Sequence, residues 1–171
     1  MSTVESLFVS HAARKLEQLC GRIVTCLAKL DADRVWLRGG EHENAIGNLV
    51  LHLCGNVRQW IGMGVAGMPD IRQRDGEFAA RSGEDPSQLA ARLTGTVNEA
   101  LEAIRALAPA DLLRIARVQG YEITVLEAVS HVVEHFAQHT GQIILLTKHA
   151  TGEDLGFYSH LSRPAHKETT P

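Results

Sequence analysis

The chain has 171 residues, of which 44% are apolar and 22% are charged, and this size and balance are typical of one soluble domain with a buried core. Disordered and collagen-like chains are excluded. Its 17 basic and 20 acidic side chains give a formal charge of -3 without any basic block, so we predict no nucleic-acid partner. Apolar runs fall far short of the roughly 20 residues that span a bilayer, and residues 1–20 lack a signal-peptide core. We therefore expect a cytoplasmic protein with no membrane partner.

The first predicted helix runs from about Val4 to Leu30, because apolar side chains recur along this segment at helical spacing. Ser2 and Glu5 have the spacing of a capping box at its start. The connection that follows, residues 31–43, contains a tryptophan, Trp36, that we expect to be exposed.

A long polar stretch separates the next two helices. Asn44 is placed to cap the second helix, which continues to about Gly64. Residues 68–84 are predicted to form a loop that is long enough to be functional. Asp85 and the proline after it then begin the third helix, which ends near Leu107.

The last third of the chain is less regular at first. Residues 111–122 have an ambiguous pattern in which a short extended piece is favoured at 114–119. Thr124 and Glu127 then form a capping box for the fourth helix, which runs to about Ala150.

Four amphipathic helices of this length predict an all-α fold, a four-helix bundle that occupies residues 1–171 as a single domain. The connection between the second and third helices is long enough to cross along the bundle, so up-down-up-down order is not assumed. Residues 155–171 should form a short apolar flap and then fray, with the apolar side chains Phe157, Tyr158 and Leu161 in the flap.

The three cysteines are expected to be structural. Cys20, Cys26 and Cys54 are odd in number, lie inside predicted helices and form no C-x-x-C pair. These features indicate reduced core residues rather than disulfides.

Histidine is used unusually often, with nine in the chain. His131, His135 and His139 recur every four residues on the fourth helix, a step about 40° beyond one full turn, so neighbours can reach one ion. On a helical wheel His139 falls within the apolar face, His135 lies at its shoulder, and His131 lies at its boundary. We therefore predict His135 and His139 as an inward pair of metal ligands and give His131 a surface or supporting role.

A transition metal that prefers nitrogen requires at least one more ligand. His52 shares an apolar stripe of the second helix with Leu49 and Leu53, so it should enter the same interior. Taken alone, His52 fits a hydrogen-bonded core histidine, and only the joint placement of the three favours a metal. Three neutral imidazoles would leave a position open for water or a thiol, as in catalytic sites.

Other chemistries are not favoured. The Glu-x-x-His motif of di-iron bundles, the H-E-x-x-H motif of metalloproteases and the G-x-S-x-G motif of hydrolases are all missing from the sequence. The remaining histidines are expected to lie outside the site: His11 as a structural residue, and His42, His149, His160 and His166 as solvated or terminal residues.

Several side chains near the predicted ligands have two interpretations. Asn56 lies one turn from His52, and Gln142 lies close to the histidine pair on the wheel, so both can line a pocket. Bonding between helices or support of a ligand explains them equally well. Trp60 either walls the pocket or packs in the core or in a dimer, and Arg58 faces solvent or a partner.

A histidine on the second helix followed by an H-x-x-x-H-x-G-Q-I run on the fourth, here residues 135–143, resembles the DinB/YfiT-like superfamily of bacterial four-helix metalloproteins. Residues 45–60, 72–78 and 152–158 resemble one uncharacterised branch of it. The resemblance therefore covers nearly the full chain.

The resemblance implies a DinB-type bundle, often dimeric, that holds nickel or zinc through His52, His135 and His139. Some relatives are thiol-dependent transferases that use bacillithiol, mycothiol or glutathione, and others carry only a hydrolase label. We therefore expect an enzyme whose metal activates a low-molecular-weight thiol or water against a small electrophilic substrate. The alternative is a non-enzymatic protein, either a metal-stabilised dimer or a stress protein that binds a small ligand.

A homodimer is expected from the same resemblance and from the fourth helix. Leu126, Val133 and Ile144 lie outside its main apolar stripe. They would give the helix a second side to bury against another copy of the chain.

Overall fold

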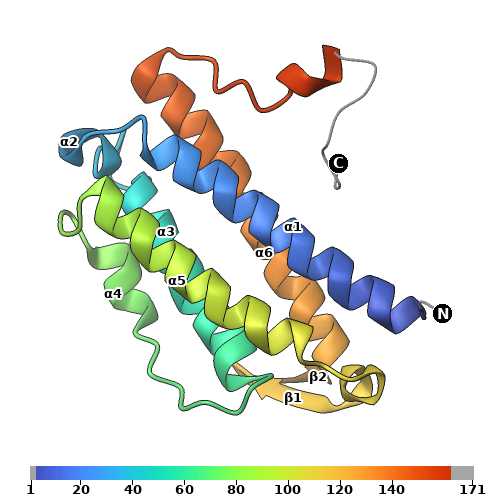
Figure 1. Ribbon diagram of the computed structural model, residues 1–171. Helices are drawn as coiled ribbons and strands as arrows, with labels where there is room; N and C mark the ends of the chain where they lie inside the picture. Colours follow the sequence, from blue (N-terminus) through green and yellow to red (C-terminus); the bar gives the residue numbers. More distant parts are fainter. Residues whose placement is uncertain (1–2, 163–171) are drawn as a thin grey trace.

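The computed structural model describes residues 3–162, and four long helices dominate it (Figure 1). These helices are α1 (Val4–Leu27), α3 (Ile46–Val57), α5 (Pro86–Arg105) and α6 (Val125–Thr151). The shorter helical elements are α2 (Ala32–Val35), α4 (Arg74–Ala79) and the 3-10 turns η2 (Pro109–Leu113) and η3 (Ser159–Ser162). The predicted all-α four-helix bundle is confirmed.

The connectivity of the bundle follows from which helices touch. α1 packs against both α5 and α6, and α3 packs against the same two helices. Figure 1 shows that α1 and α6 run in one direction, whereas α3 and α5 run in the other. Residues 64–85 connect α3 to α5 in the chain. Because these two helices run parallel, the connection returns along the length of the bundle. The order is up-down-down-up, and the long connection is a crossover.

The first helix begins and ends differently from the prediction. Thr3 is its N-cap, with Oγ1 accepting from the backbone N–H of Ser6 at 3.2 Å. The capping box is therefore formed by Thr3 and Ser6, one position after the predicted pair, of which Ser2 lies outside the described residues. The helix also ends at Leu27, three residues before Leu30, which still packs against the core.

The other helix starts show one further difference. Ala45, not Asn44, precedes α3, and Oδ1 of Asn48 accepts from the backbone N–H of Ala45 at 3.1 Å. The side chain that satisfies this helix start thus comes from inside the helix. Asp85 caps α5 and Thr124 caps α6 as predicted.

α3 continues directly into a π-helical turn, η1 (Arg58–Met63), which the sequence did not predict. Gly64 follows this turn because a Cβ there would lie 2.6 Å from the carbonyl oxygen of Trp60. The turn brings Trp60 against α6, where its ring centroid lies 4.1 Å from that of His131. Such turns are rare and frequently occur at functional sites.

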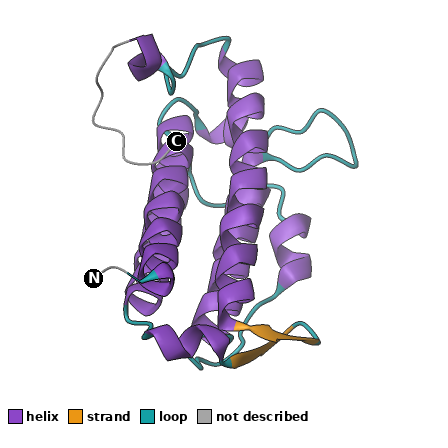
Figure 2. Cartoon of the chain, turned by 90° about the vertical axis from the view of Figure 1, so that its right-hand side faces the viewer, coloured by secondary structure: helices purple, strands orange, loops and turns teal. Residues whose placement is uncertain are grey.

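Two segments predicted to be irregular contain regular structure. Residues 68–84 include α4, so they are not a simple loop. The strands β1 (Ile115–Val118) and β2 (Tyr121–Thr124) pair antiparallel and form a hairpin at one end of the bundle (Figure 2). Its turn residues, Gln119 and Gly120, have φ values of 52 and 82, which are typical of a two-residue hairpin turn. The predicted extended piece at 114–119 is therefore the first strand, and the second was missed.

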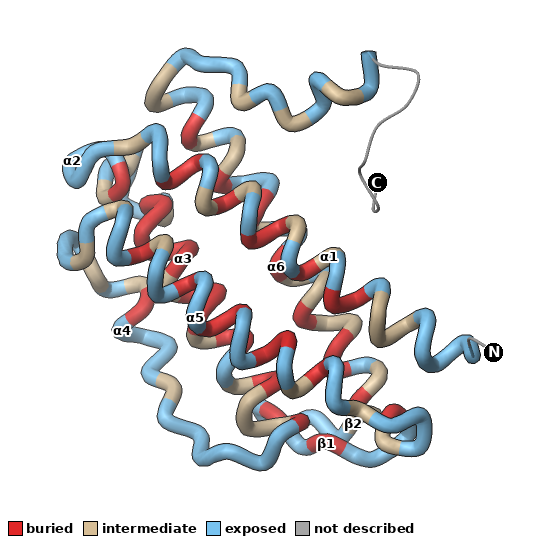
Figure 3. Tube along the Cα trace, in the orientation of Figure 1, coloured by how far each residue is buried: buried red, intermediate tan, exposed pale blue. Residues whose placement is uncertain are grey.

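The core lies where the four long helices face one another (Figure 3). Leu16 and Ile23 from α1, Leu53 from α3, Ile104 from α5 and Phe136 from α6 are each 0% exposed. Burial of such side chains is the main stabilising contribution to a bundle of this size.

Cys20, Cys26 and Cys54 are free and buried, as predicted. No helix within residues 3–162 combines the length and the apolar character needed to cross a membrane.

Two side chains lie elsewhere than predicted. Trp36 is half-buried because its ring covers Gly47, where a Cβ would lie 2.7 Å from the ring, and its Nε1–H donates to the carbonyl of Glu84 at 3.0 Å. His11 is exposed, because its position on α1 turns away from the face that packs on α5 and α6.

The predicted C-terminal flap is present only in part. Phe157 is half-buried and packs against the core, whereas Tyr158 is 62% exposed and Leu161 is 64% exposed. The guanidinium of Arg22 lies 5.7 Å and 5.3 Å from the ring centroids of Phe157 and Tyr158, which docks this segment on α1. The expected fraying of residues 163–171 lies outside the described residues.

Candidate metal centre

Three histidines that are distant in the sequence meet between α3 and α6. Nε2 of His135 lies 3.1 Å from Nε2 of His52 and 3.2 Å from Nε2 of His139. One ligand atom from each of the three side chains lies within 4.8 Å of the other two. In the part of the chain that the structure describes, this group consists of these three side chains. It therefore offers three nitrogen ligands to one ion.

The two helices account for this geometry. His135 and His139 are four residues apart, so one turn of α6 brings both rings to the same face. His52 projects from α3, which packs against α6, and is 6% exposed. His131, one turn before His135, stacks on that ring with the centroids 5.6 Å apart but does not enter the group. The structure thus brings the three predicted ligands together and places His131 beside the group.

The donor set fits a transition metal ion. Burial, followed by the proximity of His139 and His52, lowers the pKa of His135 to about 3. Burial also lowers the pKa of His139, although the hydrogen bond to Gln142 opposes the shift. Both rings of α6 are therefore neutral at pH 7, the form in which an imidazole binds a metal. Nitrogen lone pairs that converge in this way need a cation or a shared proton between them.

A carboxylate holds the other nitrogen of His52. Oε2 of Glu77 lies 2.9 Å from Nδ1 of His52, and Nη2 of Arg72 lies 3.1 Å from the same Nδ1. A carboxylate can only accept, and Nη2 already donates to Oε2 of Glu77 at 2.8 Å, so we place the ring proton on Nδ1. This tautomer leaves the Nε2 lone pair directed at the other two histidines.

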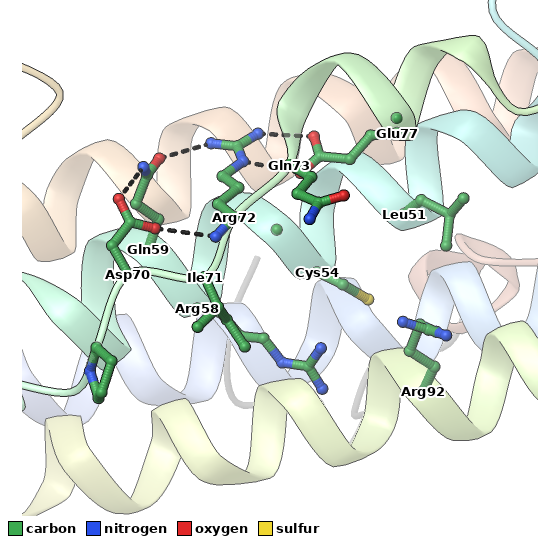
Figure 4. Close-up of a pocket in the computed structure, with 13 residues that line it drawn as sticks. Leu51, Cys54, Arg58, Gln59, Asp70, Ile71, Arg72, Gln73, Glu77 and Arg92 are labelled. Carbon is green, nitrogen blue, oxygen red and sulfur yellow. Dashed lines mark hydrogen bonds and ion pairs between the residues drawn. The ribbon is translucent and has the colours of Figure 1, made fainter.

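Arg72 fixes Glu77 in turn (Figure 4). Nε of Arg72 donates to Oε1 of Glu77 at 2.8 Å, and with the bond from Nη2 this completes a bidentate pair. Nη1 of Arg72 donates to Oε1 of Gln59 at 3.0 Å, so the guanidinium bridges the two side chains. Burial alone would raise the pKa of Glu77, but the hydrogen bonds from Arg72 and His52 hold it below its usual value. The carboxylate is therefore charged at neutral pH.

The pair has room only because residue 55 is glycine. A Cβ at Gly55 would lie 1.9 Å from Oε1 of Glu77 and 3.0 Å from Nε of Arg72. The same three residues line a cavity of about 220 Å³, whose opposite wall includes Arg92 of α5 (Figure 4).

Two side chains clamp α4 so that Glu77 reaches the site. Nδ2 of Asn48 donates to the carbonyls of Glu77 and Ala80 at 2.8 Å and 2.9 Å. Nη2 of Arg38 donates to the carbonyls of Phe78 and Ala80 at 3.1 Å and 3.0 Å. Because Asn48 lies one turn before the histidine of α3, the same helix positions both the metal ligand and its carboxylate.

Gln142 supports the histidine at the other end of the group. Its Oε1 lies 2.6 Å from Nδ1 of His139, so the N–H of that ring has an acceptor. A cavity of about 300 Å³ lies beside this contact, lined by Leu49 of α3 and by Gln142 and Leu145 of α6. Gln142 therefore both supports a predicted ligand and lines a cavity, two roles that the sequence left open.

Asn56 and Trp60 are each 4% exposed, on the face of α3 and η1 that meets α6. Oδ1 of Asn56, Nε1 of Trp60 and Nδ1 of His135 are buried and have no hydrogen-bond partner among the described residues. Trp60 packs between His131 and Tyr121, with its centroid 6.2 Å from the Tyr121 ring. Arg58 is exposed, as predicted.

Sequence reasoning missed Glu77 and Arg72 as parts of the site. They fell within the segment predicted to be a loop, where alternating charges indicate solvated side chains. The signal that points to them is chemical, because a buried histidine that binds a metal needs an oxygen acceptor for its second nitrogen.

Comparison with known protein families gives a match over nearly the whole chain. A family model described as "Protein of unknown function (DUF1572)" matches residues 3–165, which include α3, α4 and α6. No curated protein matches the sequence. The chain therefore belongs to the DUF1572 family.

Proposed function

We propose that this protein is a metal-dependent enzyme of the DinB/YfiT type, which uses a thiol or water against a small electrophilic substrate. The observation that carries the proposal is the convergence of three Nε2 atoms, from His52, His135 and His139. The up-down-down-up bundle and the resemblance of the histidine motifs support placing the chain in that superfamily.

The metal is a divalent transition ion, nickel or zinc. Imidazole nitrogens suit both of these ions, and three ligands of this kind leave one coordination position free for a small molecule. When bound, such an ion supplies Lewis acidity that favours the thiolate or hydroxide form of a nucleophile at neutral pH.

The chain's own residues bind and orient. Glu77 holds His52 with Nε2 directed into the group, and Gln142 does the same for His139. The cavity of about 300 Å³ adjoins Gln142, the side chain that holds His139, although none of the three histidines lines it. Nε1–H of Trp60 is a buried donor without a partner among residues 3–162, and it is available to an acceptor on a ligand.

The competing function is a metal-stabilised dimer without catalysis. It requires a fourth side chain on the ion, whereas the group in the described residues has three. Leu126, Val133 and Ile144 are half-buried and pack against the chain's own core, so a homodimer rests mainly on the resemblance. We keep the homodimer as part of the proposal, and light scattering over a range of concentrations tests it.

The decisive measurement is metal analysis of protein purified without a histidine tag and reconstituted separately with nickel and zinc. We expect about one ion per chain, as three converging imidazoles imply, and a value near zero contradicts the proposal. The loaded protein should then consume glutathione with a chromogenic aryl halide, or hydrolyse a nitrophenyl ester. Protein stripped of metal by a chelator is the matched control.

A further inference from the structure

Each imidazole of the group has a second nitrogen, Nδ1, and the three Nδ1 atoms differ in whether they have a hydrogen-bond partner among the described residues. Nδ1 of His52 is held by Glu77 at 2.9 Å, and Nδ1 of His139 by Gln142 at 2.6 Å. Nδ1 of His135 is buried and has no partner within the described residues. Histidines that bind metals almost always donate this second N–H to an oxygen, because the bond fixes the tautomer and the ring orientation. One acceptor of three is therefore missing from the pattern.

Asn56 is placed to be that acceptor. It is 4% exposed, and its Oδ1 is likewise buried without a partner among residues 3–162. The turn before it carries His52, which contacts His135, and the turn after it carries Trp60, which stacks on His131. Asn56 thus lies on the facing helix at the level between His131 and His135.

Once Nε2 of His135 binds a metal, the ring proton lies on Nδ1, and this buried donor and the buried Oδ1 of Asn56 each carry a desolvation penalty that a bond between them removes. The terminal torsions of the His135 ring and of the Asn56 amide are broad and roughly two-fold, so either group can turn toward the other. A ligand on Nε2 of His135 would provide the reason for that rotation.

We propose that Asn56, Glu77 and Gln142 are positioning residues, one for each imidazole, and that Asn56 accepts from Nδ1 of His135 when Nε2 of that ring binds the metal. This inference rests on the metal site of the proposed function. It adds which side chains around the three histidines set the metal affinity of that site, and it ranks the size of their effects.

Glu77 should matter most. It is the charged acceptor of the three, and Arg72, Asn48 and Gly55 fix its position from separate segments. A charged acceptor strengthens the donor ring more than an amide does. Gln142 should matter least, because it is exposed and water can replace it.

The test compares zinc affinity, measured by competition with a chromophoric chelator, in Glu77→Gln, Asn56→Ala and Gln142→Ala proteins. Loss of an outer oxygen typically weakens metal binding about 10- to 100-fold. We expect the loss to be greatest for Glu77→Gln, about tenfold for Asn56→Ala, and smallest for Gln142→Ala. Glu17→Gln, which alters an exposed glutamate of α1 that pairs with Arg105 of α5, is the matched control and should bind zinc normally.

Rescue distinguishes positioning from general structural support. Asn56→Asp keeps an acceptor at the same place, so its zinc affinity should equal or exceed that of the unchanged protein. The absorption bands of bound cobalt should shift in Asn56→Ala and return in Asn56→Asp. Unfolding curves of the metal-free proteins show whether either change acts through the fold.

Each of the following results overturns the inference. Asn56→Ala that binds zinc as tightly as the unchanged protein removes Asn56 from the pattern. Asn56→Asp that loses as much affinity as Asn56→Ala, with both folded, shows that the acceptor is not what matters. If the unchanged protein binds no metal, the proposed function fails and this inference fails with it, whereas normal binding in every variant overturns the inference alone.

Discussion

α1 and α3 pack against the same two helices, α5 and α6, yet only α3 also buries polar side chains there. The buried residues of α1 are aliphatic or cysteine, whereas those of α3 include Asn48, His52 and Asn56. The two helices also differ in exposure, because α3 is buried on almost every side and α1 keeps an exposed face. What bears on function is which side chains each helix places against α6.

This difference separates stability from chemistry within one bundle. Apolar side chains in a core stabilise without needing partners, but a buried polar group costs free energy unless it is hydrogen-bonded. In α3 most of that cost is offset by a network through Arg38, Arg72 and Glu77. A bundle selected only for stability would place leucine at these positions. We therefore expect changes on α1 to alter folding and changes between α3 and α6 to alter binding.

The largest expected effect is the loss of the metal from His139→Ala. The variant should bind no ion where the unchanged protein binds one, because only two ring nitrogens remain and the pair no longer holds a transition metal tightly. Metal analysis after reconstitution checks this. The bundle should stay folded, with helical circular dichroism retained, because its stability comes from the apolar faces.

His131→Ala is the control for this change, since His131 stacks on His135 without entering the group. It should keep the ion. If it loses the metal as completely as His139→Ala, the choice of ligands is wrong. A large drop in melting temperature for His139→Ala but not for His131→Ala would favour a structural metal instead.

The reverse experiment removes an apolar side chain from α1. Leu16 is 0% exposed, and Leu16→Ala should lower the free energy of unfolding by about 2 to 5 kcal/mol through lost burial and the cavity left behind. Denaturant titration measures this loss, and the folded variant should still bind one ion. Leu145→Ala is the control, because Leu145 is 55% exposed and the change should stay within about 0.5 kcal/mol.

A glycine-to-alanine change should have opposite signs in the two helices. Nothing lies within 4 Å of a Cβ at Gly21 of α1, whereas one at Gly55 of α3 meets Glu77 and Arg72. Gly21→Ala should stabilise by about 0.5 to 1 kcal/mol through lower entropy of the unfolded chain. Gly55→Ala should destabilise by about 1 to 3 kcal/mol through overpacking, and it should weaken zinc binding. Equal unfolding curves for both variants would show that Glu77 does not pack closely against residue 55.

The smallest effect concerns the thiols. Burial raises the pKa of Cys20 to about 11 and that of Cys54 to about 11, whereas an unfolded thiol titrates near about 8.5. Because the folded values are raised, this contribution to stability is fully present below about pH 8.5 and is lost as pH rises toward about 11. A disulfide reagent at pH 8 should react slowly with the folded protein. In guanidinium it should react rapidly with all three cysteines. Rapid reaction of Cys54 in the folded state would show that α3 opens there.

The hairpin and α4 show why sequence patterns failed where they did. Each element is short and depends on contacts from distant segments: β2 on its pairing with β1, and α4 on the hydrogen bonds from Arg38 and Asn48. Periodicity over so few residues carries little information, and such contacts are invisible before the chain folds. The π-helical turn at η1 also has a distant neighbour, because Val118 of β1 lies against Gly64 directly after it.

By itself, the sequence determined the long helices, the caps at Asp85 and Thr124, and the three histidines, because each depends on local spacing along one helix. Only the tertiary structure decided that α3 and α5 run parallel, that Glu77 and Arg72 reach His52 from the crossover, and that Oδ1 of Asn56 and Nδ1 of His135 are buried without partners among the described residues. These features depend on which helices touch and at what level, and packing of the whole bundle sets that level.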